Sequence, residues 1–388
     1  MNAEIKIEKL VFGGSGLGFV DGKAVFVEGA LPDEKVLAKI TAEKHNYCKA
    51  HVIKVLEASP ARIHPPCPYI YACGGCQYQH VTYTQELHWK EEQVRESFTQ
   101  VLKIDPARIE KIRFGRKEYG YRTSITLHRT QKKNNKPQRL AFVGRDNRSM
   151  IMIDNCMLAD PALRKVFISE FHLEKNERKR VFKVTEKDEV VSSDAESNYR
   201  IKVKGAPFWT NSKGFFQNNL EITELIGKQL AAWVEAINPA RFIDLCSGVG
   251  TFSILAASKV SEIFCFEENP HSIACLKRNF RELNIPLGKA ITGRVEKTFP
   301  SFILDNRKER TLVFLDPPRQ GIESSLSRAL AHEEGIENII YLACDLQILI
   351  RDLRILLSAG RYEISSIIPF DMFPRTKHIE VLVRLTRI

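Results

Sequence analysis

No stretch of this sequence is long and apolar enough to form a membrane span, because every hydrophobic run falls short of the ~18 residues that crossing a bilayer requires. The first six residues are charged and lack the apolar stretch of a secretory signal. Internal repeats and low-complexity tracts are also absent, and the composition, 44% hydrophobic and 27% charged, excludes collagen-like, disordered and small disulfide-scaffold proteins. We therefore expect a monomeric cytoplasmic protein whose 388 residues form two or three domains.

The nine cysteines point to reduced thiols, because the chain has no export signal and disulfides are rare inside cells. Cys67, Cys73 and Cys76 lie within ten residues of one another, and Cys156 follows later. Four thiolates form a tetrahedral sulfur site, which binds zinc or an iron–sulfur cluster. The spacing predicts a metal site and leaves the metal open.

The net charge of +11 is unevenly distributed: residues 120–160 carry eight basic and three acidic side chains. A local excess between Arg122 and Arg148 suits a polyanion such as nucleic acid. A solvated basic loop at residues 131–136 explains the same charges equally well.

Residues 1–57 have the pattern of short strands with turn signals, including the hairpin signal Asp21-Gly22. The glycine cluster at residues 13–18 precedes a hairpin rather than a helix, which excludes a dinucleotide-binding turn. Five short strands in under sixty residues indicate a small barrel, of the kind that often docks on RNA. A purely structural barrel would give the same pattern.

The rest of the chain changes character at about residue 216. Before that point we expect one helix, at residues 83–102, and an irregular, strand-rich stretch at residues 120–215. After it, strands and helices alternate as in a doubly wound parallel sheet with an antiparallel edge. The predicted elements of this part are a helix at 220–237 and strands at 241–245, 262–267, 311–315, 338–343, 362–368 and 378–385. The expected domains are residues 1–58, 59–215 and 216–388.

A glycine turn follows the first strand of this sheet, at residues 244–253. Gly248 and Gly250 let a ligand approach the backbone, whereas Ser253 replaces the third glycine of a dinucleotide fingerprint. Glu267 ends the next strand, where a carboxylate accepts hydrogen bonds from ribose hydroxyls. This pattern favours S-adenosylmethionine over a dinucleotide. Residues 316–319, Asp-Pro-Pro-Arg, follow the fourth strand. This segment either holds a planar base through its carboxylate or forms a rigid turn with a structural aspartate.

Cys344 stands where the fifth strand stops, at the edge of the sheet where ligands bind in such folds. A cysteine is often only a small core residue, which is our interpretation of Cys265 and Cys275. The functional interpretation is that its thiolate adds to carbon 6 of uracil, so that carbon 5 attacks a methyl sulfonium. A base then removes the carbon-5 proton; Glu380 is the candidate, with His378 as its rival.

With these residues in place, nearly the whole chain resembles the RNA uracil-5-methyltransferase family, in particular its iron–sulfur-containing 23S ribosomal RNA enzymes. The resemblance implies an α/β fold: a Rossmann-like S-adenosylmethionine-dependent methyltransferase domain with a doubly wound mixed sheet. A small TRAM-like, OB-type β-barrel and an α+β iron–sulfur domain would precede it. It implies S-adenosylmethionine contacts, a [4Fe–4S] cluster and two catalytic residues. The cofactor residues are Gln217, Asp244, Cys246, Gly248, Thr251, Glu267 and Asp316; the cluster ligands are Cys67, Cys73, Cys76 and Cys156; Cys344 is the nucleophile and Glu380 the base.

Two positions depart from the family pattern. The family usually has Ser-Cys-Asn-Pro around the nucleophile, whereas this chain has Asp345 and Leu346 after Cys344. A carboxylate beside a thiol opposes thiolate formation, unless its side chain turns away from the sulfur. Arg294 stands where the family often has a polar or acidic residue near the adenine, which leaves the adenine contact unassigned.

Three hypotheses follow for the function. The first is carbon-5 methylation of a specific uridine, with 23S ribosomal RNA as the expected substrate and uridine 54 of transfer RNA as the alternative. The second is methylation of an exocyclic base amine, which needs residues 316–319 but no thiol. The third is an RNA-binding homologue that has lost its activity.

Overall fold

The computed structural model describes residues 1–130, 139–169, 177–257, 260–305 and 310–388. Contacts between residues divide the chain into two compact units, each built from several segments. The first unit comprises Met1–Gln93, Ala141–Ile153 and Phe373–His378; the second comprises Val94–Leu140, Asp154–Met372 and Ile379–Ile388. The three consecutive domains stay a prediction, because these units group segments by contact rather than by sequence order. The basic loop at residues 131–136 lies outside the described residues.

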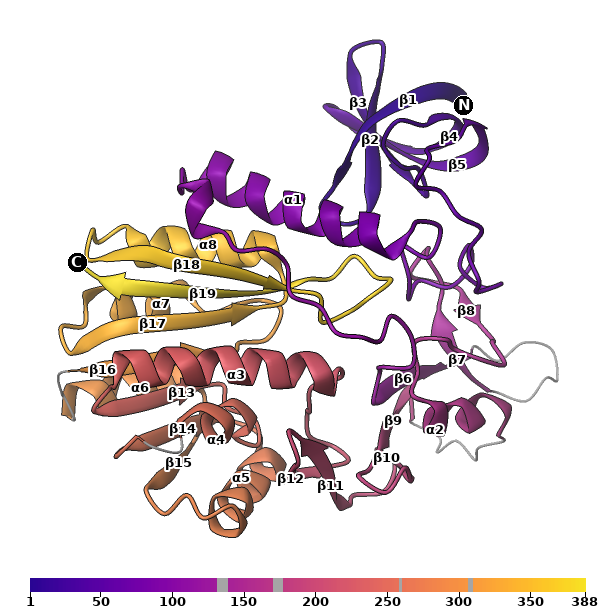
Figure 1. Cartoon of the computed structure of the whole chain (residues 1–388). Coiled ribbons are helices and arrows are strands. Elements are labelled where there is room, and N and C mark those ends of the chain that lie inside the picture. Colours follow the sequence, from indigo (N-terminus) through magenta and orange to yellow (C-terminus); the bar gives the residue numbers. More distant parts are fainter. Residues whose placement is uncertain (131–138, 170–176, 258–259, 306–309) are drawn as a thin grey trace. The chain divides into compact units, whose positions relative to one another are not determined.

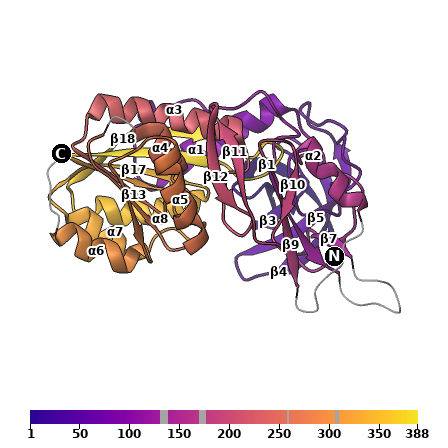
Figure 2. The same cartoon turned by 90° about the horizontal axis from the view of Figure 1, so that it is seen from below.

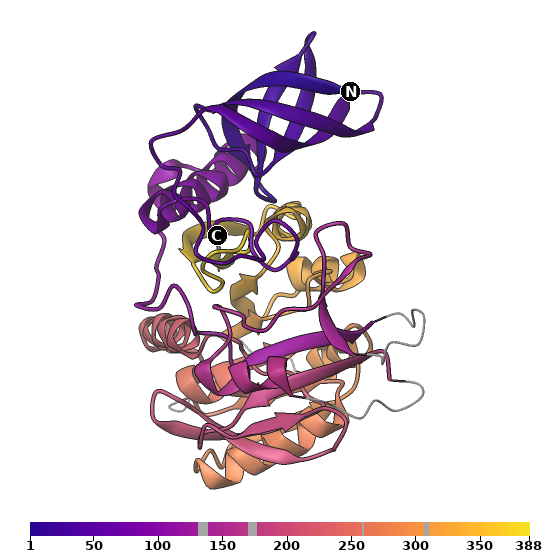
Figure 3. The ribbon, with the colours of Figure 1, turned by 90° about the vertical axis from the view of Figure 1, so that its right-hand side faces the viewer.

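The N-terminal strands close into a barrel in the first unit, as Figure 3 shows in indigo. Its strands are β1 (Asn2–Val11), β2 (Ser15–Val20), β3 (Lys23–Glu28), β4 (Lys35–Glu43) and β5 (Tyr47–Glu57), joined in the order β1-β2-β3-β5-β4. Alternate apolar residues such as Ile5, Val25 and Val36 fill its interior. Asp21 and Gly22 both have positive φ, as the two central residues of a type I′ hairpin require. The predicted barrel and hairpin are therefore confirmed.

Buried charges hold the remaining segments of the first unit together. Helix α1 (Tyr83–Val101) begins in this unit, and its Glu86 pairs with Lys90 at 2.7 Å. Glu86 also accepts a hydrogen bond of 2.8 Å from the backbone N–H of Arg375, in the segment that connects the last two strands of the chain. Because both carboxylate and ammonium are fully buried, removing either partner would leave an uncompensated charge.

The second unit contains a seven-stranded sheet in the order β15-β14-β13-β16-β17-β19-β18. The first five strands are parallel to one another, and β19 pairs antiparallel with both β17 and β18. This confirms the predicted doubly wound sheet with an antiparallel edge. Figure 2 shows α3 and α4 on one side of the sheet and α6, α7 and α8 on the other. The strands are β13 (Arg241–Leu245), β14 (Ile263–Glu267), β15 (Gly288–Thr292), β16 (Thr311–Leu315), β17 (Ile336–Ala343), β18 (Tyr362–Phe370) and β19 (Glu380–Arg387). The helices are α3 (Leu220–Ile237), α4 (Thr251–Ala257), α5 (Pro270–Glu282), α6 (Val295–Asp305), α7 (Ser324–His332) and α8 (Leu346–Leu357).

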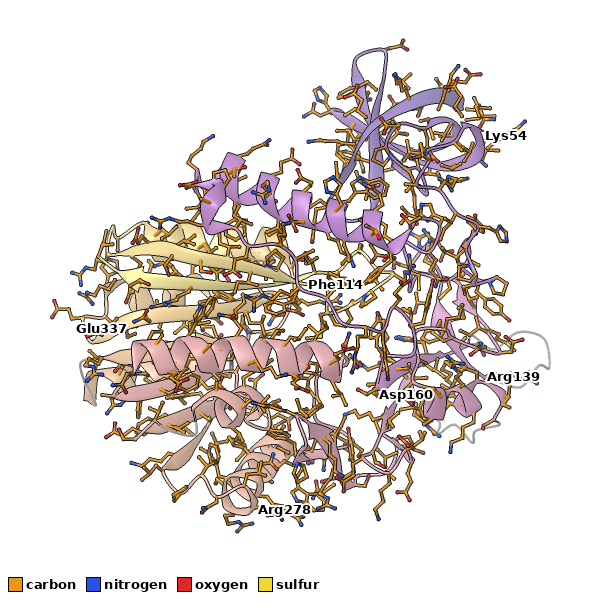
Figure 4. All side chains as sticks on the ribbon, in the orientation of Figure 1. Lys54, Phe114, Arg139, Asp160, Arg278 and Glu337 are labelled. Atoms are coloured by element: carbon orange, nitrogen blue, oxygen red, sulfur yellow. The ribbon has the colours of Figure 1, made fainter. Side chains whose placement is uncertain are left out.

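Local signals fix where these elements begin and end. The side chain of Asn219 caps α3 by accepting a hydrogen bond from the N–H of Ile222, and Asn238 ends the helix in the left-handed conformation. The central strands β13 and β16 are buried along their whole length, as a sheet covered by helices on both faces requires. Glu337 lies at the start of β17 and points outward (Figure 4), whereas Cys344 directly follows the other end of this strand.

The other elements are short, and Figure 1 labels most of them. In the second unit, β9 pairs antiparallel with both β6 and β10, and β11 pairs with β12. In the first unit, β7 pairs with β8. These elements are β6 (Ser124–Arg129), β7 (Leu140–Val143), β8 (Met150–Ile151), β9 (Lys179–Val184), β10 (Val190–Ser192), β11 (Asn198–Val203), β12 (Ala206–Asn211), α2 (Pro161–Arg164) and two 3₁₀ turns, Pro106–Arg108 and Lys165–Ile168. Within the described ranges, no helix has the length and apolarity that a bilayer crossing demands.

Candidate active site

Strand pairing places the candidate nucleophile opposite the candidate base. β17 pairs with β19 so that Ala343 faces Val381. Continued by one residue, this register brings Cys344 level with Glu380, whose charge acts on the thiol. Asp316 follows β16, the parallel neighbour of β17, and therefore lies at the same edge of the sheet. The structure thus brings together three of the predicted residues that lie far apart in the sequence.

The thiol of Cys344 is partly exposed rather than packed in the core. Burial raises its pKa to about 12, and the charges of Glu380 and Asp316 act in the same direction, whereas the guanidinium of Arg319 lowers it. A thiol with this pKa keeps its proton at neutral pH. Cys48, Cys265 and Cys275, by contrast, are buried.

Glu380 is a buried carboxyl group at the start of β19, with 6% of its surface exposed. Burial is the main reason that its pKa lies well above the usual value; the charge of Asp316 raises it further and Arg319 opposes the shift. A carboxylate with a raised pKa is a stronger base once it is ionised. Its position and its environment both suit proton removal.

Asp345, the acidic residue beside the nucleophile, turns toward the helix that follows. Its carboxylate accepts hydrogen bonds of 3.1 Å from the backbone N–H groups of Gln347 and Ile348 and so caps α8. Leu346, which replaces the family's proline, is buried at the first position of this helix. The departure from the family pattern therefore gives a helix cap, and the carboxylate bonds to amides rather than to the sulfur.

The glycine turn after β13 is closed by the carboxylate of Glu267. One oxygen of Glu267 accepts a hydrogen bond of 2.8 Å from the N–H of Gly248, and the other accepts one of 2.7 Å from the N–H of Asn269. Each carboxylate oxygen accepts two hydrogen bonds, so both keep capacity for ligand hydroxyls. A Cβ at Gly248 would meet no atom within 4 Å, and the φ of +57° suits glycine. The backbone of this turn is open to a ligand.

Asp244, at the buried end of β13, forms part of a polar network in the sheet interior. The hydroxyl of Ser253 donates to one carboxylate oxygen of Asp244 and also lies 3.1 Å from the sulfur of Cys265. The other oxygen of Asp244 is buried and has no hydrogen-bond partner among the described residues. Burial raises the pKa of this carboxyl well above its usual value, and the charges of Asp316 and Glu267 contribute. A buried acceptor without a donor indicates a missing partner.

Asp316 is tied to Gln217, another predicted cofactor residue. The side-chain amide of Gln217 donates a hydrogen bond of 3.0 Å to Asp316, while burial raises the pKa of this carboxyl to about 7. The turn before Gln217 is held by Lys183, whose buried ammonium donates to the carbonyl oxygens of Asn211 and Gly214. Burial lowers the pKa of Lys183 to about 8.

The remaining predicted cofactor residues surround the same turn. Cys246 has a positive φ of 68°, and its thiol pKa is raised by burial and by nearby carboxylates, first of all Glu267. Thr251 is buried at the first position of α4. Arg294 is exposed and forms ion pairs with Glu323 at 2.7 Å and with Glu296 at 3.6 Å, so its contacts leave the adenine contact unassigned.

His378, the rival base, belongs to the first unit, where its ring contacts that of Phe373 edge to face. Cys344 and Glu380 belong to the second unit. The role of His378 therefore stays an untested alternative.

The four cysteines predicted to bind a metal are distributed over both units: Cys67, Cys73 and Cys76 in the first, Cys156 in the second. The sulfur of Cys76 is buried and accepts a hydrogen bond of 3.0 Å from the side-chain amide of Gln79. Over the part of the chain that the structure describes, no three His, Cys, Asp or Glu side chains form a group that suits a metal ion. The geometry therefore does not support the predicted cluster.

Sequence reasoning missed two features of the site. The sequence assigns no role to Arg319 within residues 316–319, yet its charge acts on both Cys344 and Glu380. The capping role of Asp345 was also missed, although an Asp directly before an amphipathic helical pattern is a known start signal. The first depends on tertiary structure, whereas the second was available from the sequence.

Two family models match the chain. A model described as the TRAM domain matches residues 3–53, which lie within the barrel, and one described as conserved hypothetical protein 95 matches residues 225–347. An uncharacterized RNA methyltransferase of Treponema denticola is 30% identical over 404 residues, which cover 97% of this chain and 97% of that protein. The tRNA (uracil(54)-C(5))-methyltransferase of Schizosaccharomyces pombe is 29% identical over 414 residues, covering 99% of this chain and 78% of that protein.

One solved structure extends the likeness to three dimensions. It is the Pyrococcus abyssi tRNA (uracil-54, C5)-methyltransferase in complex with S-adenosyl-L-homocysteine. The TM-score is 0.73 with 20% sequence identity, and the match covers 100% of both chains. The likeness shows a shared fold, which confirms the prediction of a methyltransferase sheet preceded by a barrel.

Proposed function

This chain belongs to the family of S-adenosylmethionine-dependent RNA methyltransferases, and we propose that it methylates carbon 5 of a specific uridine in structured RNA. The observation that carries the proposal is the register of β17 and β19, which sets a partly exposed thiol opposite a buried carboxyl group. Carbon-5 methylation needs this combination of a nucleophile and a base, because the uracil ring must first be activated and then deprotonated.

In the proposed reaction, the thiolate of Cys344 adds to carbon 6 of the ring and the ring electrons move to carbon 5. Carbon 5 would then take the methyl group, and the bond between that methyl and the sulfonium sulfur would break with its electron pair left on the sulfur. The carboxylate of Glu380 removes the proton from carbon 5, after which the bond between sulfur and carbon 6 breaks and the thiolate leaves with its electron pair. The nearby guanidinium of Arg319 favours the thiolate.

The residues around the glycine turn suit S-adenosylmethionine, which supplies an electrophilic methyl group when it is bound. Glu267 would accept the ribose hydroxyls, and the open backbone at Gly248 leaves room for the ligand. The unpartnered buried oxygen of Asp244 provides an acceptor that the protein itself does not satisfy. The full proposed set is Gln217, Asp244, Cys246, Gly248, Thr251, Glu267 and Asp316.

The environment of Asp345 supports an active enzyme rather than a homologue that has lost its activity. The carboxylate of Asp345 accepts hydrogen bonds from two backbone N–H groups of α8, so it faces the helix. The pKa of the Cys344 thiol is raised by burial, Glu380 and Asp316, so the residue that departs from the family pattern is not what holds the proton on the nucleophile.

Two RNA classes are candidates for the substrate. The sequence predicts 23S ribosomal RNA, from the barrel together with the four cysteines. Transfer RNA is the second candidate, favoured by the relative from Schizosaccharomyces pombe, which acts on uracil 54 of tRNA and matches 99% of this chain. In either case the barrel would bind RNA phosphates, and one base would leave its stack at a cost of a few kcal/mol.

The test is methyl transfer from tritiated S-adenosylmethionine to unmodified transcripts of both RNA classes, with the labelled nucleotide mapped by mass spectrometry. Label at carbon 5 of a uridine supports the proposal, and the transcript that accepts it identifies the substrate class. Label on an exocyclic amine that persists after Cys344→Ala would establish the competing reaction instead.

A [4Fe–4S] cluster on Cys67, Cys73, Cys76 and Cys156 stays a separate proposal that rests on residue type alone. No step of the reaction depends on it. Anaerobic purification followed by iron and sulfide analysis tests it: about four irons per chain would support the cluster, whereas iron-free, fully folded protein would exclude it.

A further inference from the structure

A buried carboxylate on α8, that of Asp352, contacts the loop at residues 320–322, which follows the candidate site residue Asp316. The side chain of Asp352 is fully buried, and one of its oxygens accepts hydrogen bonds from the hydroxyl of Tyr341, at 2.7 Å, and from the N–H of Ile322, at 3.2 Å. The other oxygen pairs with the guanidinium of Arg351 at 2.7 Å. A buried carboxylate satisfied by three different donors is rigid and fixes the segments that supply them.

Arg351 extends this network to the same loop. Its guanidinium donates hydrogen bonds to the carbonyl oxygens of Gln320, at 2.9 Å, and Ile322, at 3.2 Å. Between these two residues, Gly321 has a φ of +73°, and a Cβ there would clash with Asp352 and Arg351. The backbone of the loop therefore packs directly on the charged pair, which only glycine permits.

The loop held in this way carries Arg319. The N–H of Gly321 donates a hydrogen bond of 2.8 Å to the carbonyl of Pro318, which makes residues 318–321 a tight turn. Arg319 lies inside this turn, one residue before the first clamped carbonyl. The same helix that holds the turn also begins directly after the nucleophile, with Asp345 as its cap.

We propose that Arg351 and Asp352 form a positioning pair that fixes Arg319 beside the thiol of Cys344 and the carboxyl group of Glu380. The proposal rests on the proposed function only in assigning the nucleophilic role to Cys344. Neither residue of the pair touches the reacting atoms; they act through the turn at residues 318–321.

The electrostatic consequence is measurable without RNA. Arg319 is the one cation that lowers the pKa of Cys344 in the folded protein, among the described groups that act on it. If the turn loosens, the thiolate loses this support, and alkylation of Cys344 shifts to higher pH. A shift of about half a pKa unit makes the alkylation roughly threefold slower at a fixed pH below the pKa.

The experiment measures iodoacetamide labelling of Cys344 against pH by peptide mass spectrometry, in Arg351→Met and in Arg354→Met. Both variants remove one arginine charge from α8, but Arg354, which is exposed on the same helix, takes no part in the network. We expect slower labelling of roughly threefold in Arg351→Met and wild-type labelling in Arg354→Met. Asp352→Asn, which keeps the shape of the side chain, should resemble Arg351→Met.

A double-mutant cycle separates positioning from a general loss of structure. In an Arg319→Ala background, Arg351→Met should cause no further slowing, because the group that it positions is gone. Equal effects of Arg351→Met and Arg354→Met would overturn the proposal, and so would slowing that persists in the Arg319→Ala background. A failure of uridine methylation would leave these labelling results standing and would refute the proposed function alone.

Discussion

The capping role of Asp345 makes a prediction about two substitutions that differ in a single respect. In Asp345→Ala, the amides of Gln347 and Ile348 lose the carboxylate that they bind at 3.1 Å. Replacing an N-cap Asp by Ala costs about 1 kcal/mol, whereas Asn caps nearly as well as Asp. A loss of about 1 kcal/mol makes opening of the first turn of α8 roughly fivefold more frequent. Hydrogen–deuterium exchange of these two amides should therefore accelerate by that factor in Asp345→Ala and change little in Asp345→Asn.

The same pair tests whether the charge of Asp345 acts on the nucleophile. Asp345→Asn removes the charge but keeps the cap. The pH dependence of iodoacetamide labelling at Cys344 should therefore shift less from that of the wild type in Asp345→Asn than in Glu380→Gln. Equal exchange in both Asp345 variants would show that the side chain does not cap the helix. A larger labelling shift in Asp345→Asn than in Glu380→Gln would show that the carboxylate acts on the sulfur after all.

Three further outcomes follow from the site. Cys344→Ala should abolish methyl transfer to uridine, by at least a thousandfold, while cofactor binding measured by calorimetry stays within about twofold. The pKa of Asp316 is about 7 in the folded protein against a usual value of 3.8, so the folded protein binds this proton more tightly than the unfolded chain does. The stability that the bound proton contributes is complete in acid and is lost as the pH rises from about 4 to about 7. Asp316→Asn should flatten the pH profile of the melting temperature over that range. Lys183→Met should lower the free energy of unfolding by about 1–3 kcal/mol, because the carbonyls of Asn211 and Gly214 lose their buried donor.

Much of the fold was predictable because local and global signals agree. The helix at residues 220–237 has a capping Asn before it, an apolar face along it and a left-handed Asn after it, and its observed bounds, Leu220–Ile237, are those predicted. The continuous apolar runs of β13 and β16 likewise predicted strands buried on both faces. β15, at the parallel edge, was not identified, because its exposed and half-buried residues show no continuous apolar run.

The site was predictable in its positions but not in its electrostatics. Residues such as Asp316 and Cys344 follow strand ends, and the carboxyl ends of parallel strands meet at one edge of a sheet. The charge of Arg319 on Cys344 depends on how a turn folds back, which spacing alone does not determine. The Asp352 network joins Tyr341 to the loop at residues 320–322 and was invisible in the sequence for the same reason.

The most direct test of the central claim is to trap the bond between sulfur and the pyrimidine ring. RNA in which uridine is replaced by 5-fluorouridine offers no proton for the base to remove from carbon 5, so the adduct cannot collapse after methyl transfer. We predict a denaturation-resistant complex of protein and RNA whose cross-linked peptide contains Cys344. This complex should form only when S-adenosylmethionine is present, at a rate comparable with turnover, and it should be absent in Cys344→Ala. Turnover of natural uridine RNA to 5-methyluridine without any such complex, or a complex through another cysteine, would contradict the account.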